Sequence, residues 1–481
     1  MTIRFYSEES VPVEMHRARI VQKLQLLTIE ERLEKIQEAG NNTILLYNKD
    51  IYLDMLTDSG VNAMSDEMQA AMFVADDSYA GSSTYLKMAN KLKEIFDMNY
   101  FLPAHQGRAC EHILVKRFVK KMDIIPMNVR FDSIKEFISQ AGAQYVELIT
   151  TEALVVNSNN PFKGNFDLDK LENILKEHCG KNIPFIRIEA GSNLIGGQPL
   201  SLENIKQVSE IAKKYNVLVV LDASLLQDNL YFIKQREEKY QSLTIREITK
   251  EISKVVDIIY FSARKLGFAR GGGICIRDEN LYRSMQKYIP MYEGFTTYGG
   301  MSVKEMEAIT VGLEETMEEN VISHGPTFIQ YMVNELDKYG IPVIKPGGGL
   351  GVHIDAKVFL PHVDMNEYPA GALAAALYIC SGIRCMERGT ISEQPNEDGS
   401  ENFPMLELIR LALPRRVFSL SHVKYAVDRL KWLYDNRELV GGLTFIEQPK
   451  ELRFYFGKLK PTSKWQEYLV KKFKEDFGDS L

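Results

Sequence analysis

The chain has 481 residues, 45% of them hydrophobic and 26% charged, with a formal net charge of −7 at pH 7. This length predicts at least two domains, and the acidic balance argues against a nucleic-acid partner, because a phosphate backbone attracts concentrated positive charge. The longest apolar runs, such as 217–221, are too short to span a membrane, and the first residues lack the pattern of a signal peptide. We therefore expect a cytoplasmic globular protein without a membrane partner.

The cysteines and histidines give no metal-binding pattern. The five cysteines are odd in number and show no CxxC spacing, which predicts reduced thiols. The eight histidines form no HExxH motif and no mixed cysteine–histidine cluster. We expect no metal among the catalytic groups.

The middle of the chain alternates predicted helices and strands. Segment 104–114 is a polar glycine turn that opens a helix, and short β-rich runs follow at 144–149, 184–190, 217–223 and 256–262. Amphipathic segments separate them, such as 201–216, where Ser201 and Asn204 form an N-capping pattern and Asn216 ends the helix. Continuous apolar strands separated by helices predict an α/β fold with a mostly parallel sheet covered on both faces.

The pattern changes near residue 320. Segment 321–356 predicts a helix, a strand, a glycine turn and a second strand, and 400–414 predicts a strand followed by a helix from Ser421. The tail, 450–477, alternates lysines with acids and predicts a solvated helix face. We expect an N-terminal arm and part of a small domain in 1–56, a large domain in 57–320, and a smaller α+β domain in 321–481.

Informative residues follow the predicted strands. In parallel sheets ligands bind beyond the carboxyl ends of the strands, where Asn193, Asp222 and Lys265 fall. Arg108 stands at the entrance of the 104–114 helix, where free backbone donors and the helix dipole favour an anion such as phosphate. A phosphate cradle, a carboxylate and a lysine at one sheet edge predict pyridoxal 5'-phosphate (PLP).

The chemistry of PLP needs each of these groups. A lysine amine forms a Schiff base with the aldehyde, a carboxylate holds the pyridine nitrogen protonated so that the ring is an electron sink, and an aromatic ring such as Phe131 stacks on the cofactor. Each residue alone has a commoner structural explanation. Their joint occurrence in a parallel α/β chain favours the cofactor site.

Several motifs carry a family resemblance over most of the chain: 54-DMLTDSGVNAMSDEMQAAM-72, 105-HQGR-108, 162-FKGNFDLDKLE-172, 193-NLIGGQPLS-201, 292-YEGFTTYGG-300, 383-IRCMERG-389 and 409-IRLALPRRV-417. In these the chain resembles the aromatic amino-acid β-lyases, the tyrosine phenol-lyases and tryptophanases. These are PLP enzymes of fold type I, the aspartate-aminotransferase-like fold, with a large and a small domain. The resemblance implies a homodimer or homotetramer with shared active sites and a small amino-acid substrate.

The resemblance also implies residue roles. Lys265 is the Schiff-base lysine and α-proton base, Asp222 pairs with the pyridine nitrogen, Asn193 bonds the phenolic oxygen of the cofactor, and Phe131 stacks on its ring. The implied phosphate ligands are Gln106, Gly107, Arg108, Ser262 and, where the family has a lysine, Arg264.

On the substrate side, the resemblance makes Arg410 the fork for the α-carboxylate, helped by Thr57. A buried guanidinium in the otherwise apolar run 405–413 also needs an anion. Tyr79 resembles the general acid that protonates the leaving group from a neighbouring subunit. The leaving-group pocket is mixed: Met386, Arg388 and Phe454 match the tyrosine phenol-lyases, in which the arginine binds the phenol oxygen, whereas Asp132 matches tryptophanase.

Two departures from the family leave alternatives open. Leu225 replaces a family arginine and Leu350 a family histidine, and loss of a buried charge weakens control of charge on the cofactor ring. The first interpretation is β-elimination from tyrosine or a ring-modified tyrosine. The alternatives are β-substitution, carbon–sulfur cleavage, or a weakly catalytic homologue with a scaffolding role.

The family also binds potassium, at positions that match Gly60, Asp77 and Arg270. An arginine has no acceptor and cannot ligate a cation. We therefore hypothesise that Arg270 replaces the ion by pairing with Asp77, which makes activity independent of potassium.

Overall fold

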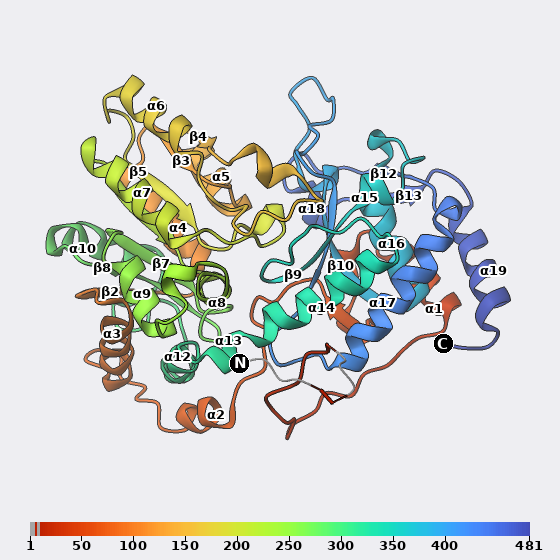
Figure 1. The fold of residues 1–481 in the computed structure, drawn as a ribbon, viewed down its shortest axis with the longest axis horizontal. Coiled ribbons are helices and arrows are strands. Elements are labelled where there is room, and N and C mark those ends of the chain that lie inside the picture. Colours follow the sequence, from red (N-terminus) through yellow and green to blue (C-terminus); the bar gives the residue numbers. More distant parts are fainter. Residues whose placement is uncertain (1–4, 7–9) are drawn as a thin grey trace.

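A computed structural model describes residues 5–6 and 10–481. The chain forms two sheet-centred halves that lie side by side, a seven-stranded sheet with its helices and a four-stranded sheet with its own helices (Figure 1). Part of the N-terminal arm that we expected lies outside the described residues. The predicted boundaries at 56/57 and 320/321 stay predictions.

The larger sheet is mostly parallel, as predicted. β8 runs antiparallel to both of its neighbours, and the other pairs are parallel. In spatial order the strands are β2 (Tyr100–Ala104), β8 (Gly272–Ile276), β7 (Ile258–Ser262), β6 (Leu218–Asp222), β5 (Phe185–Glu189), β3 (Ile124–Met127) and β4 (Gln144–Glu147).

Alternation along the buried strands gives this sheet two cores. Val219 and Leu221 of β6 pack on one face and Val220 on the other, because successive side chains of a strand point to opposite sides. One face is covered by α4 (Gly107–Phe118), α5 (Asp132–Gln140), α10 (Glu279–Gln286) and α11 (Tyr288–Tyr292). The other is covered by α3 (Ser83–Phe96), α6 (Leu168–His178), α7 (Leu202–Lys214), α8 (Leu226–Arg236), α9 (Ile245–Ser253) and α12 (Val303–Glu315).

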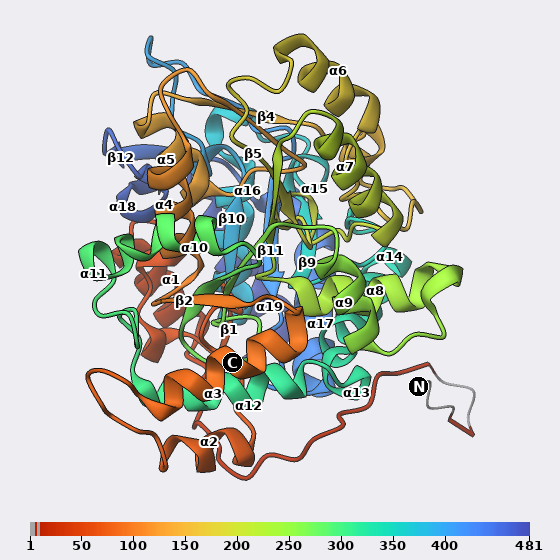
Figure 2. The same ribbon diagram turned by 90° about the vertical axis from the view of Figure 1, so that its left-hand side faces the viewer.

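Local signals place these helices where the sequence predicts them. The side chain of Ser201 accepts a hydrogen bond from the Asn204 amide at the start of α7, and Asn216 follows its end with φ of 56°. Helix α2 (Asp66–Met72) packs with α3 against α12 (Figure 2). The short α13 (Glu319–Ile322) leads into the smaller half.

The smaller sheet takes strands from both ends of the chain. β1 (Leu53–Met55) pairs in parallel with β10 (Ile383–Arg388), and β11 (Leu408–Ala412) lies antiparallel between β10 and β9 (Gly351–Asp355). Around it lie α1 (Ile29–Glu38), α14 (His324–Lys338), α15 (Ala356–Phe359), α16 (Pro369–Ser381), α17 (Leu420–Asp435), α18 (Arg453–Phe456) and α19 (Trp465–Phe477). A hairpin of β12 (Leu443–Glu447) and β13 (Lys458–Pro461) completes this half.

Two expectations for this half are wrong. In place of the first strand expected in 321–356 there are two isolated bridges, from Val343 to Ile354 and from Lys345 to Asn157. The tail expected as one helix contains α18, β13 and α19, and α19 buries Trp465, Leu469 and Phe473. The tail contains aromatic residues between its charged ones, and burial of the aromatic side chains determines which face of α19 packs against the protein.

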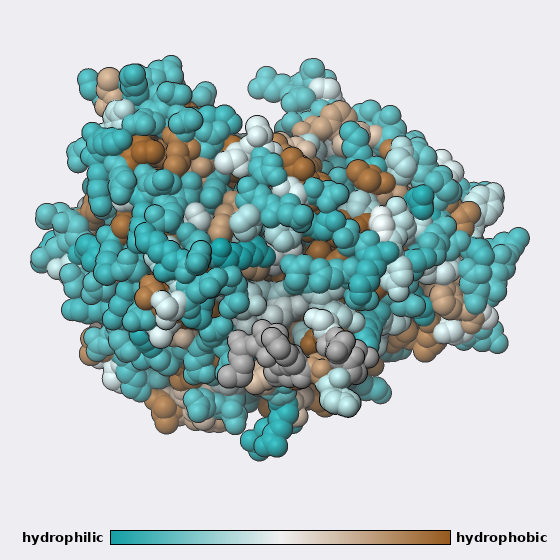
Figure 3. Space-filling model, viewed as in Figure 1, coloured by the Kyte–Doolittle hydropathy of each residue, from teal (hydrophilic) through white to brown (hydrophobic). Residues whose placement is uncertain are grey.

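The face of the molecule seen in Figure 3 is mostly hydrophilic, with scattered hydrophobic side chains. None of the helices in the described part of the chain is both long and apolar enough to cross a membrane.

Candidate active site

A cavity of about 220 Å³ lies between the carboxyl ends of the larger sheet and the strands of the smaller one. Except for Tyr79 and Arg264, the predicted site residues all line it. They are Thr57, Gln106, Gly107, Arg108, Phe131, Asp132, Asn193, Asp222, Ser262, Lys265, Met386, Arg388, Arg410 and Phe454. Predicted site residues that are far apart in the sequence therefore lie around one cavity.

The start of α4 forms the floor of an anion cradle. No side chain caps this helix, so its first backbone N–H groups are free for a ligand. A Cβ on Gly107 would stand 3.0 Å from the Ser262 Cβ and 3.4 Å from the Ser224 hydroxyl. The absence of a side chain at this position keeps space between the helix end and two hydroxyl groups, and Arg108 adds a positive charge at the same edge.

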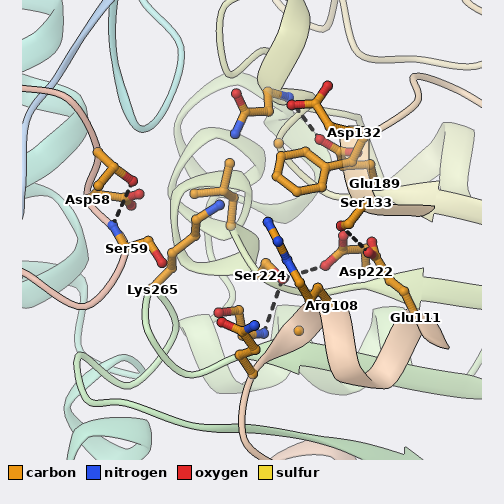
Figure 4. A pocket seen from close by; sticks show the side chains of 18 of the residues that line it. Asp58, Ser59, Arg108, Glu111, Asp132, Ser133, Glu189, Asp222, Ser224 and Lys265 are labelled. Atoms are coloured by element: carbon orange, nitrogen blue, oxygen red, sulfur yellow. Dashed lines mark hydrogen bonds between the residues drawn. The ribbon is translucent and has the colours of Figure 1, made fainter. Parts of the chain in front are cut away.

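Lys265 lies in the middle of the cavity (Figure 4). It follows β7, and its backbone N–H donates to the Ser262 carbonyl in the turn that leaves the strand. The ammonium group stands 5.5 Å from the centre of the Phe131 ring. Asp58 and Ser59 lie on one side of Lys265, and carboxylates of the larger sheet lie on the other (Figure 4).

A buried polar cluster behind Asp222 was not predicted. Arg187 and Glu189 come from β5 and Tyr260 comes from β7, the two strands that flank β6, and Glu111 comes from α4. Burial raises the pKa of both Glu111 and Glu189 to about 7. The sequence did contain an indication of this cluster. In the fully buried strand 185-FIRIE-189, the charged side chains at positions i and i+2 lie on one face of the strand and need partners there.

Arg410 is placed to bind a carboxylate. It lies on β11, with one terminal nitrogen donating to the Asn193 side-chain oxygen at 2.9 Å and the other to the Leu56 carbonyl at 2.9 Å. Its Nε is buried without a partner in the described structure, and burial lowers its pKa to about 9. Because Arg410 also lines the cavity, its guanidinium is a candidate partner for an anion that enters it.

Arg388 and Asp132 form an ion pair across the cavity at 2.7 Å. Burial acts to raise the pKa of Asp132, but the Arg388 guanidinium outweighs it and holds that pKa below its ordinary value. The Nε of Arg388 has no partner in the described structure, and the ring of Phe454 lies 6.0 Å from the guanidinium carbon. The two residues that resemble different relatives thus act as one polar unit.

The two family positions that have lost their charge meet in space. Leu225 and Leu350 pack together with Ala412 in a small buried cluster, and Leu225 lines the cavity. The two positions where the resemblance implies an arginine and a histidine therefore carry leucines that belong to one buried cluster.

Two predicted site residues lie outside the cavity. Tyr79 is 66% exposed and stacks on Phe295 with ring centres 4.5 Å apart. Arg264 donates from its Nε to the Ser59 hydroxyl at 3.2 Å, and its role as a phosphate ligand stays a prediction. The lack of a side chain on Gly60 leaves room for the Arg264 guanidinium, which a Cβ there would meet at 2.6 Å.

The predicted pairing of Arg270 with Asp77 is wrong. Arg270 is an exposed side chain that pairs with Glu305 at 3.4 Å, and the Arg270 backbone N–H donates to the same carboxylate. Glu305 belongs to the nearby α12, whereas Asp77 lies in a loop before α3. The hypothesis that Arg270 replaces a cation depended on an ion pair with Asp77, and in this chain Arg270 pairs with Glu305 instead.

Glu387 supports the segment that carries Arg388. It accepts hydrogen bonds from the backbone N–H groups of Gly389 and Ile391 and from the Ser392 hydroxyl. Burial and the neighbouring Glu407 carboxylate raise its pKa from the ordinary 4.5 to about 8. The folded protein thus keeps a proton on this carboxyl that the unfolded chain releases above pH 4.5.

We expect Glu387→Gln to flatten the dependence of stability on pH. Glu387 contributes to the wild-type free energy of unfolding, and this contribution decreases as the pH rises from 4.5 to 8. The reason is that the unfolded state binds fewer protons at this carboxyl than the folded state. Glutamine has no proton to lose. Urea unfolding at a series of pH values tests this, with Glu397→Gln at an exposed position as the control. Equal slopes for the wild type and Glu387→Gln would contradict the assignment.

The chain is similar to known proteins over most of its length. The profile of the beta-eliminating lyase family matches residues 54–429. The tyrosine phenol-lyase of Lacrimispora saccharolytica is 39% identical over 451 residues, 93% of this chain and 96% of its own. That of Symbiobacterium sp. strain SC-1 is 37% identical over 452 residues, 94% of this chain and 99% of its own.

The solved structures agree on the fold. A threonine aldolase from Leishmania major superposes with a TM-score of 0.57 at 15% identity and covers 79% of this chain and 99% of its own. The fold is therefore the predicted fold type I arrangement, and its cavity lies where the matched family positions converge. By its sequence over most of its length, this chain belongs to the beta-eliminating lyase family.

Proposed function

We propose that this protein is a PLP-dependent lyase that converts tyrosine and one water molecule, by β-elimination followed by hydrolysis, into phenol, pyruvate and ammonium. The observation that carries the proposal is the convergence in one cavity of Lys265, the Asp222 carboxylate and the anion cradle of α4, with Arg410 and Arg388 as further cations. The names and high coverage of the relatives support tyrosine as the substrate.

The residues present fit PLP. The free N–H groups at the start of α4, Gly107, Ser262 and Arg108 would hold the phosphate, Phe131 would cover the ring, and Asp222 would face the pyridine nitrogen. PLP, when bound, supplies an electron sink joined to the substrate α-carbon. The protein itself has to bind, orient and move protons.

Each polar residue then has a defined task. Arg410, which lines the cavity, binds the substrate carboxylate, and Lys265 takes the proton from the α-carbon. At the other end of the substrate, Arg388 donates to the ring hydroxyl, and Asp132 accepts the hydroxyl proton as a hydrogen bond. These contacts fix the ring, so that a proton delivered to it releases phenol.

The first expected result concerns cofactor attachment. Borohydride reduction of the PLP-loaded protein is expected to label the peptide that contains Lys265. The internal control is Lys163, which is buried and has a pKa lowered to about 8 by burial, but whose ammonium donates to the carbonyls of Val155 and Lys345 at 2.6 Å. A label on Lys163, or a protein that takes up no PLP, would contradict the proposal.

The acid that protonates the leaving ring comes, in this proposal, from a second copy of the chain. Tyr79 is exposed and lies outside the cavity of its own chain, so a homodimer or homotetramer with shared sites brings it to the neighbouring cavity. The five cysteines are free thiols, the usual state in a reducing compartment, and the proposal includes a cytoplasmic location.

Shared sites predict complementation between two inactive variants. Tyr79→Phe and Lys265→Ala are each expected to be inactive, but their mixture after subunit exchange regains up to about a quarter of wild-type activity. Half of the mixed dimers are hybrids, and in each hybrid one of the two sites has both residues intact. Pyruvate release after co-refolding measures this. A mixture as inactive as its parents would show that Tyr79 acts within its own chain or not at all.

A further inference from the structure

Arg187 is a fully buried arginine on β5 that the proposed reaction does not use. Its guanidinium donates to the Asp222 carboxylate at 2.7 Å, to Glu189 at 3.0 Å and to the backbone carbonyl of Val129 at 3.2 Å. Its Nε donates to the Tyr260 hydroxyl at 2.8 Å. One side chain therefore bonds four partners: Glu189 lies on β5 itself, Asp222 and Tyr260 lie on β6 and β7, and Val129 lies in the segment after β3.

These partners lead directly to the cofactor-facing residues. Asp222 is itself one of them. Glu189 accepts a hydrogen bond from the Asn193 backbone N–H at 2.9 Å with its other oxygen. Val129 lies two residues before Phe131. A single guanidinium thus connects the carboxylate, the amide and the aromatic ring that face the proposed cofactor.

The register of the sheet explains why these groups meet. Glu189 of β5 lies beside Asp222 of β6, which lies beside Tyr260 of β7. The Tyr260 hydroxyl is 3.0 Å from both Asp222 and Glu111, and Ser133 donates to Glu111. Figure 4 shows Glu111, Ser133, Glu189 and Asp222 together on one side of the cavity.

Two explanations for Arg187 make different predictions. It could only offset buried negative charge, since three carboxylates surround it. It could also orient its partners, because the planar guanidinium of an arginine fixes the direction of its hydrogen bonds as well as the position of its charge. Here the guanidinium is bonded to the segments that carry Asp222, Asn193 and Phe131.

We propose that Arg187 is a positioning residue that orients Asp222 and Asn193 toward PLP and holds the Phe131 segment against the sheet. The inference rests on the proposed function, because it assumes that PLP occupies the cavity. It concerns a residue that contacts neither the substrate nor the cofactor.

The experiment compares PLP binding with stability in three variants. Arg187→Met removes the fork and the charge, Arg187→Lys keeps the charge alone, and Arg187→Met/Glu111→Gln removes the charge together with one carboxylate that does not contact Asn193. PLP dissociation constants come from absorbance titration of the apoprotein, and free energies of unfolding come from urea denaturation of the same apoprotein.

Arg187→Met is expected to weaken PLP binding by about 10- to 100-fold, the range seen when partners that orient ligand-binding side chains are removed from metal sites. The visible spectrum of the bound cofactor is expected to shift, because the group facing its ring nitrogen moves. Arg187→Lys is expected to bind more tightly than the methionine variant but less tightly than the wild type. The double variant is expected to regain stability without regaining PLP affinity.

Wild-type affinity in Arg187→Met, or recovery of affinity in the double variant, would overturn the inference, because either result reduces Arg187 to charge compensation. If Arg187→Met does not fold, unchanged affinity and spectrum in Arg187→Lys would overturn it equally. Failure of the wild type to bind PLP is a different result, since it would overturn the proposed function and this inference together.

Discussion

Lys265→Ala is expected to lower the rate of pyruvate release by about 10⁴-fold. General acid–base groups contribute about 10²- to 10⁴-fold, and the lysine in this proposal also joins the cofactor covalently. The position supports this size of effect, because Lys265 lies in the middle of the cavity, beside Phe131. Steady-state kinetics with tyrosine and excess PLP measure the loss.

The matched control is Lys265→Arg, which keeps a positive charge but cannot transfer a proton at neutral pH. It is expected to be as inactive as the alanine variant, although both proteins remain folded and take up PLP without covalent attachment. Activity within tenfold of wild type in either variant would exclude Lys265 as the base.

Arg388→Ala is expected to reduce kcat/KM for tyrosine by about 30- to 5000-fold. Truncating one partner of a buried charge pair costs about 2 to 5 kcal/mol, and Arg388 is buried against Asp132. The effect is expected to depend on the leaving group. S-alkylcysteines carry no ring hydroxyl for Arg388 to bind, so their cleavage is expected to change little.

Part of that loss comes from the carboxylate that Arg388 leaves unpaired. The double variant Arg388→Ala/Asp132→Asn separates the two contributions, because asparagine brings no charge to the emptied site. It is expected to recover part of the lost activity toward tyrosine. An equal loss for tyrosine and for S-alkylcysteines in Arg388→Ala would show that Arg388 supports the fold and does not recognise the ring.

The sequence predicted best those features that depend on local pattern. Apolar runs followed by amphipathic helices predicted β5, β6 and β7, and the residues that follow these strands had to meet at one sheet edge, as Asn193, Asp222 and Lys265 do. The family resemblance added residues such as Arg410, which no local pattern could bring to the same cavity.

Interactions between distant segments were not predictable in this way. Arg270 pairs with Glu305, which lies on the nearby helix α12, and not with Asp77, which lies in a loop. The Arg187 cluster depends on the register of three strands and on the position of α4 above them. The contact of Leu225 with Leu350 joins residues that are far apart in sequence, so no local pattern could predict it.

The account is tested most directly by incubating the PLP-loaded protein with tyrosine and measuring phenol and pyruvate in the same sample. Parallel incubations contain tryptophan, ring-substituted tyrosines and S-alkylcysteines. The account predicts equal amounts of phenol and pyruvate from tyrosine, and loss of both in Lys265→Ala. Pyruvate from S-alkylcysteines but from no aromatic substrate would favour carbon–sulfur cleavage, and no pyruvate from any substrate would contradict the assignment as a lyase.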